Sequence, residues 1–150
     1  MTVEEREIEI VRLGAQGDGI ATASDGRQLF VPLALPGERV RLEGGEPARI
    51  VGSASPERRT PVCRHYAICG GCVAQHMSED LYAEWKRGIV VEAFRQRGLE
   101  PDVAPLLRVP PGSRRRAVLT ARRGAKAGTR QGEGPITLGY HSRRSHALFD

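Results

Sequence analysis

The chain has few aromatic residues, few lysines and no long apolar run. Aromatic side chains make up 5% of its 150 residues, so a large apolar recognition surface is not expected. Lys86 and Lys126 are the only lysines among the 23 basic residues, and the rest are arginines. No apolar run approaches the roughly 18 residues of a membrane span, and the acidic start MTVEEREIEI lacks a signal-peptide pattern. We therefore expect a cytoplasmic protein that does not enter a membrane.

Cysteine is also scarce, but its three occurrences are close together. Cys63, Cys69 and Cys72 form the pattern Cys-x5-Cys-Gly-Gly-Cys, and an odd number of cysteines in a reducing compartment argues against disulfides. Gly70 and Gly71 would let the backbone turn tightly, so that the three thiolates converge. Converging thiolates indicate a metal ion or an iron–sulfur cluster. A catalytic thiol would instead need one exposed thiolate of low pKa.

The identity of the metal is left open by the residues themselves. Zinc takes four ligands, and His76, four residues after Cys72, would complete a Cys3His site, with His65 as a second candidate. A 4Fe-4S cluster normally takes four thiolates, and this chain has three. Three unrelated cysteines are the less favoured interpretation of so tight a spacing.

Basic residues gather in the last third of the chain. Residues 1–52 hold six basic and nine acidic residues, whereas residues 108–150 hold ten basic and two acidic ones. A basic region of this kind is typical of a protein that binds a polyanion. The predicted RNA contacts are Arg114, Arg115, Arg116, Arg122, Arg123, Arg143 and Arg144. The alternative is a solvated basic surface on a hairpin.

The first 52 residues have the pattern of short strands separated by turns. Apolar residues alternate in EREIEIVRL, and Asp-Gly or Pro-Gly pairs at 18–19, 25–26 and 36–37 separate the next runs. Five strands at this spacing predict a small barrel of the oligonucleotide-binding (OB) kind over residues 1–52. Phe30 is the one aromatic residue of this region.

A linker and cysteine loop at residues 53–77 separate the predicted barrel from a helix that starts near Ser78. Ser78 is a good N-cap, and Gly98 suits the C′ position after the last turn. The apolar face of the helix would consist of Leu81, Trp85, Ile89 and Phe94. We expect Trp85 to be a core residue rather than a base-stacking one.

Residues 114–123, RRRAVLTARR, alternate like a strand, with Ala117, Leu119 and Ala121 on one face and Arg116 and Arg122 on the other. A glycine-rich turn at 124–134 follows, and 136–150 resumes strand character. The predicted fold class is therefore mainly β with one helix. Residues 78–150 would comprise the helix and part of a central α/β or β region.

Two segments resemble a known family. GDGIATASDGRQLFVPLALPGERVRL looks like the TRAM domain, a small RNA-binding β-barrel, and CRHYAICGGCVAQHMSEDLYAEWKR is similar to the iron–sulfur segment of the RNA uracil-5-methyltransferases. The match includes Gln75 and His76 after the cysteines and Lys86 in the helix. SRRRAVLTARR and ITLGYHSRRSHALFD resemble the central β-region of that family. The chain thus resembles the N-terminal part of such an enzyme.

The resemblance implies a cofactor and a reaction. It implies a 4Fe-4S cluster on the three cysteines, with a fourth cysteine shortly after the stretch matched by Ser145, His146 and Asp150, where this chain ends. It also implies a parent enzyme that transfers a methyl group from S-adenosylmethionine to C5 of a uracil in ribosomal or transfer RNA. In that family a cysteine attacks C6, and a base later removes the C5 proton.

The catalytic machinery itself is not expected in these 150 residues. No strand is followed by a glycine-rich nucleotide loop, and no further cysteine remains for attack on C6. We expect a monomeric RNA-binding and cluster-holding part that is inactive alone. The alternatives are a stand-alone RNA-binding or zinc- or iron–sulfur-binding module and a redox- or iron-sensing protein.

Overall fold

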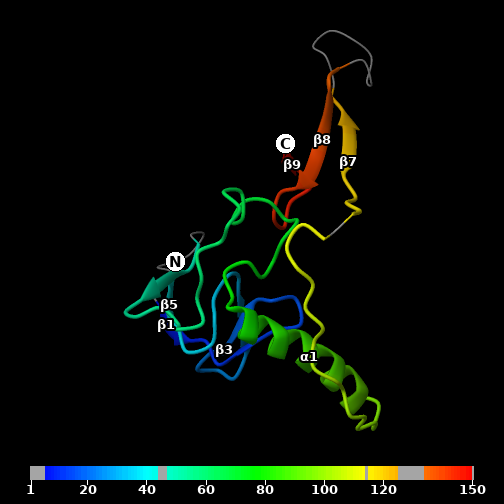
Figure 1. The fold of residues 1–150 in the computed structure, drawn as a ribbon. Coiled ribbons are helices and arrows are strands. Elements are labelled where there is room, and N and C mark those ends of the chain that lie inside the picture. Colours follow the sequence, from blue (N-terminus) through cyan, green and yellow to red (C-terminus); the bar gives the residue numbers. More distant parts are fainter. Residues whose placement is uncertain (1–5, 44–46, 114, 125–133, 150) are drawn as a thin grey trace. The chain divides into compact units, whose positions relative to one another are not determined.

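A computed structural model of the chain describes residues 6–113, except 44–46, and residues 115–124 and 134–149. It is mainly β with a single helix among these residues, as the sequence predicted (Figure 1). The chain forms two compact units: the first comprises Met1–Pro61 and Ala74–Leu107, and the second comprises Val62–Val73 and Arg108–Asp150. The division at residues 52 and 77 stays a prediction. No helix in the described part is both long enough and apolar enough to cross a membrane.

The strands of the first unit form two antiparallel sheets of three strands. One has the order β1 (Arg6–Glu9), β5 (Arg39–Leu42), β6 (Arg49–Val51), and the other the order β2 (Arg12–Leu13), β3 (Gly19–Thr22), β4 (Gln28–Val31). These are six strands where the sequence predicted five, because the run EREIEIVRL is shared between the sheets. Ile10 N–H donates to Glu38 O, and Val11 N–H donates to Ile20 O. Closure of the described strands into a barrel stays a prediction.

One apolar core cluster of this unit includes Ile8 and Ile10 from the alternating run EREIEIVRL. It consists of Ile8, Ile10, Ala21, Val31, Ala34 and Val40. Gly19 allows β3 to approach it closely, since a Cβ atom there would lie 2.8 Å from both Ala34 O and Ile10 Cγ2. No larger residue fits at this position unless the backbone shifts.

The helix α1 (Glu79–Arg95) begins and ends as its sequence predicted. The Ser78 hydroxyl accepts a hydrogen bond from Leu81 N–H at 3.1 Å, which makes Ser78 the N-cap. At the other end, Leu99 N–H donates to Phe94 O and Gly98 N–H to Arg95 O. Gly98 has a φ of 69°, so these bonds form a Schellman motif.

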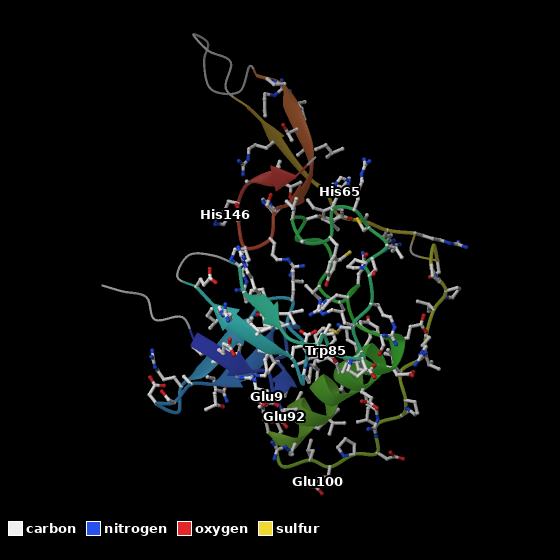
Figure 2. All side chains as sticks on the ribbon, turned by 90° about the vertical axis from the view of Figure 1, so that its left-hand side faces the viewer. Glu9, His65, Trp85, Glu92, Glu100 and His146 are labelled. Carbon is white, nitrogen blue, oxygen red and sulfur yellow. The ribbon has the colours of Figure 1, made fainter. Side chains whose placement is uncertain are left out.

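Within the first unit, Trp85 anchors α1 to the segment around Gly14 and to Leu35 (Figure 2). Its ring is 9% exposed, and its Nε1–H donates to Gly14 O at 2.8 Å, so it is a core residue as predicted. Leu81 and Ile89 pack on the same cluster. The prediction for Phe94 was wrong, because its side chain is 38% exposed. Steps of four residues bring 81, 85 and 89 to one face, and a further step of five turns the side chain away from it.

Residues 53–61 belong to the first unit, and an ion pair holds them to it. The side chain of Glu38 is fully buried, and Arg58 donates to both of its carboxylate oxygens, at 2.6 and 2.7 Å. Arg58 also donates to Leu33 O. Burial by itself would raise the pKa of Glu38, but hydrogen bonds from Arg58 and from the N–H groups of Leu35 and Ser55 outweigh it and hold the pKa below its ordinary value. This contact ties the segment to Glu38, the residue before β5.

The second unit contains a small antiparallel sheet of β7 (Thr120–Arg123), β8 (Ile136–His141) and β9 (Leu148–Phe149), in that order. The strand predicted for 114–123 is confined to its last four residues, so Arg116 and Arg122 do not share a strand face. The predicted apolar face was also wrong, because Ala117, Leu119 and Ala121 are all exposed. The described residues of this unit place no element against that face. Residues 125–133, most of the predicted glycine-rich turn, lie outside the described residues.

Candidate functional site

The cysteine loop, residues 62–73, belongs to the second unit and is shaped by its own turns. Tyr66 N–H donates to Cys63 O, and Cys69 N–H donates to His65 O at 2.8 Å. Cys63 and Cys69 are half-buried, Cys72 is exposed, and none of the three is in a disulfide. The loop therefore keeps three thiols available for chemistry.

The three thiols do not converge. In the part of the chain that the structure describes, no three His, Cys, Asp or Glu side chains gather closely enough to hold a metal ion. The donor set itself fits an iron–sulfur cluster, since thiolates are its usual ligands. Gly71 N–H also donates to Cys69 Sγ at 3.4 Å. The chemistry of the donors thus fits a cluster, although the described side chains are not grouped around one point.

The two glycines between the cysteines lie in a turn, as predicted, although neither has a positive φ. They also allow a close approach to β8. A Cβ atom on Gly70 would lie 2.8 Å from His141 O, the atom to which Gly70 N–H donates at 2.9 Å. On Gly71 a Cβ atom would lie 3.4 Å from the Tyr140 ring. The glycines let the loop lie directly against β8.

Arg143 fastens the cysteine loop to the turn after β8. Its N–H donates to Ile68 O at 2.8 Å, and its Nη2 donates to Cys72 O at 2.8 Å. Its guanidinium lies 5.6 Å from the centre of the Tyr66 ring. The role of Arg143 in RNA binding stays a prediction. In the structure its side chain contacts Cys72 O and the Tyr66 ring of the loop.

The other predicted RNA contacts have different surroundings. Arg114 lies outside the described residues. The exposed arginines of the set are Arg115, Arg116, Arg122, Arg123 and Arg144. Arg122 Nη2 also donates to His146 O at 2.6 Å, which joins β7 to the turn before β9. All of the described members lie in the second unit, and their contact with RNA stays a prediction.

A shallow groove of about 490 Å³ lies beside the cysteine loop, within the second unit. Its lining residues are Gly70, Gly71, Tyr140, His141, Ser142, Arg144, Ser145 and His146. Figure 2 marks His146 at this turn and His65 on the cysteine loop. Sequence reasoning had not assigned Tyr140, His141 or Ser142 to a site. The signal available was the dense polar and aromatic run GYHSRRSH.

The two histidines considered as zinc ligands are engaged separately. His65 Nε2 accepts a hydrogen bond from Arg64 Nε at 2.9 Å. His76 belongs to the first unit, where it is 1% exposed and its carbonyl accepts from Arg59 N–H. Neither histidine is part of a metal-binding group among the described residues.

Comparison with known proteins gives the class of the homologues. No family model matches the chain. Its homologues are RNA methyltransferases: it is 44% identical over 147 residues to an uncharacterized RNA methyltransferase of Caulobacter vibrioides, which covers 95% of this chain and 34% of the relative. An uncharacterized RNA methyltransferase of Brucella suis is 41% identical over 147 residues, with 96% and 33% covered.

One of the similar relatives has a more specific name. The chain is 36% identical over 155 residues to the 23S rRNA (uracil(1939)-C(5))-methyltransferase RlmD of Halomonas elongata, which covers 97% of this chain and 31% of that relative. The chain therefore spans about a third of the length of the relatives it matches.

Proposed function

We propose that these 150 residues are part of an S-adenosylmethionine-dependent RNA (uracil-C5-)methyltransferase that acts on ribosomal RNA. The observation that carries this proposal is the 36% identity to RlmD over nearly the whole chain. Because the chain spans about a third of its relatives, we assign it the RNA-contacting and cluster-holding role. We expect it to be inactive alone, and transfer RNA is the second candidate substrate.

Residues 1–52, within the first unit, would be the TRAM domain of this enzyme. Support comes from its two small antiparallel sheets, built from short strands over residues 6–51, with an apolar core between them. Small β-barrels of this size bind single-stranded nucleic acid through a surface groove.

The second unit would hold a 4Fe-4S cluster through Cys63, Cys69 and Cys72, with a fourth ligand from elsewhere in the protein. Support comes from three thiols outside disulfides and from the Gly71 N–H bond to Cys69. When bound, the cluster would supply iron–thiolate bonds that fix the loop. Gly70 and Arg143 would hold the loop against β8 while the thiols move together.

Methyl transfer is tested with the complete gene product. The enzyme is incubated with a ribosomal RNA transcript and radiolabelled S-adenosylmethionine, and the product is mapped by mass spectrometry. We expect one 5-methyluridine in the transcript and none when that uridine is replaced by cytidine. Absence of label from ribosomal RNA, with label in transfer RNA, would move the substrate to the alternative. Absence of label from both would overturn the proposal.

The cluster is tested by purification without oxygen. We expect brown protein with iron and acid-labile sulfide in equal amounts, and loss of both in Cys69→Ser. Stoichiometric zinc without iron would overturn the cluster and favour the zinc alternative. We also propose that the enzyme is a cytoplasmic monomer, which light scattering of the complete protein and cell fractionation would test.

A further inference from the structure

The second unit is an almost purely basic surface. By sequence it holds eleven basic and two acidic residues, and both acidic ones, Glu133 and Asp150, lie outside the described residues. The described part of this unit therefore contains basic side chains and no carboxylate side chain. A groove in such a surface attracts an anion.

The turn after β8 contains two consecutive arginines, Arg143 and Arg144, whose surroundings differ. Ser142 N–H donates to Ala147 O, and Ser145 N–H donates to Ser142 O, which closes a tight turn with Arg144 at its third position. Arg144 has a φ of 53°, a conformation that is costly for a residue with a side chain. Arg143 Nη2 donates to Cys72 O, and Arg144 is exposed and lines the groove.

The groove also contains an aromatic surface. Tyr140 is 38% exposed, and its ring lies against Gly71, where the missing side chain leaves room. Tyr140 follows Leu138 on the same face of β8, but only Tyr140 lines the groove. Proteins that bind single strands combine aromatic rings, on which bases stack, with basic groups that follow the backbone, and this groove contains both Tyr140 and Arg144.

We propose that this groove binds one nucleotide of single-stranded RNA, with the base stacked on Tyr140 and the phosphate held by Arg144 and the groove-lining residues Ser145 and His146. A volume of about 490 Å³ lies within the range of small-ligand sites. This inference rests on the proposed function for the choice of RNA as the polymer. It adds a recognition site outside the predicted TRAM barrel and assigns it to named residues.

The experiment measures, by fluorescence anisotropy, the binding of a short fluorescent uridine oligonucleotide to the 150-residue chain. Tyr140→Ala should weaken binding about tenfold, because the base no longer has a ring to stack on, and Tyr140→Phe should bind nearly as the parent does. Leu138→Ala is the matched control, since it removes an apolar side chain from the same strand face outside the groove. Equal binding by Tyr140→Ala and Leu138→Ala would overturn the stacking role.

The phosphate is tested with Arg144→Gly, because glycine keeps the turn at positive φ without strain. The log–log salt slope should flatten by about 0.7 relative to the parent chain, whereas Arg97→Ala, at the helix end in the first unit, should leave the slope unchanged. An unchanged slope in Arg144→Gly would overturn the phosphate contact. Circular dichroism of each variant shows that it is folded. If Tyr140→Ala unfolds, the parent chain is titrated with the oligonucleotide and the NMR signals of the His146 ring are followed. A shift of these signals would support the site, and no shift would overturn it.

Two further measurements are needed. The first tests whether the groove prefers RNA to free phosphate, and the second distinguishes failure of this proposal from failure of the proposed function. Uridine monophosphate and inorganic phosphate are titrated alone; stronger binding of the oligonucleotide supports the polymer, and equal binding of all three would overturn RNA as the ligand. Methylation by the complete enzyme is measured in parallel. If the oligonucleotide binds but the enzyme does not methylate RNA, only the proposed function is overturned. If the enzyme methylates RNA but the groove does not bind the oligonucleotide, only the nucleotide site is overturned.

Discussion

The two units of the chain are stabilised in different ways. The first holds twelve basic and sixteen acidic residues, and the second holds eleven basic and two acidic ones. Both apolar core clusters lie in the first unit. Among the described residues of the second unit, Tyr66 is the only buried apolar side chain. One unit is therefore a conventional core with a balanced surface, and the other is a basic surface with almost no core.

This difference indicates which unit depends on a ligand. Apolar burial and the Glu38–Arg58 pair stabilise the first unit from within. The second unit relies on backbone hydrogen bonds around Gly70 and Arg143, which contribute only about 1 kcal/mol each. A bound cluster or RNA would add stability selectively to the second unit, because ligand binding stabilises the folded state that binds it.

The largest expected effect is on the first unit. Glu38→Ala leaves Arg58 without its carboxylate and should cost about 3–5 kcal/mol of unfolding free energy. Urea unfolding monitored by the fluorescence of Trp85, the single tryptophan, measures this unit. The matched control is Asp25→Ala, which breaks an exposed pair with Arg27 and should cost less than about 1 kcal/mol. A cost no larger than that of the control would show that the Glu38–Arg58 pair does not hold the unit together.

The next largest effect is expected where the cysteine loop contacts β8. Gly70→Ala puts a Cβ atom 2.8 Å from His141 O and should cost about 1–3 kcal/mol locally. The half-buried thiols of Cys63 and Cys69 should then react faster with a thiol reagent. Gly124→Ala is the control in the same unit, since its Cβ atom would meet only ordinary contacts. Unchanged thiol rates in Gly70→Ala would mean that the loop does not depend on this approach.

Local signals explain what the sequence alone could predict. Ser78 and Gly98 mark the helix ends because each satisfies backbone groups within a few residues. Asp25-Gly26 marks a turn because Gly26 has a φ of 83° there. These features depend on neighbours in the chain, so a single sequence contains them.

Long-range contacts explain what the sequence alone could not predict. Glu38 meets Arg58 across twenty residues, and Gly70 meets His141 across a much longer stretch. Neither partner is implied by composition or periodicity, so the sequence indicates the turn at Gly70 but not the strand that it approaches. The groove was missed for the same reason, since two separate segments line it.

Acidification should weaken the first unit through Glu38. The pKa of its carboxyl is lower in the folded protein than in the unfolded chain, so its contribution is present above the ordinary pKa of about 4.3 and is lost as the pH falls through the folded value. Urea unfolding of the parent at pH 7 and in steps below about pH 4 should show this loss. In Glu38→Gln the acid-dependent loss should be smaller. Equal pH profiles would assign acid sensitivity to other carboxyls.

The salt dependence of RNA binding tests the basic surface as a whole. Replacing Arg114, Arg115 and Arg116 by Ala removes up to three guanidinium groups from the RNA phosphates, and the log–log salt slope should flatten by about 0.7 for each phosphate that is no longer neutralised. Affinity should fall about equally for different RNA sequences, because phosphate contacts carry no sequence information. An unchanged slope would leave these three arginines as a solvated surface and place the RNA site either at the Arg144 groove or on the first unit.

The smallest expected effect concerns Phe30, the aromatic residue of the predicted barrel. It is 57% exposed on β4, so it is available for stacking, but its unit carries more acidic than basic residues. Like charge repels the RNA backbone, so Phe30→Ala should change affinity much less than Tyr140→Ala does. Anisotropy with the same uridine oligonucleotide compares the two variants directly. A loss of about 1–3 kcal/mol in Phe30→Ala, the size of one stacked base, would place the main RNA contact on the first unit in spite of its charge.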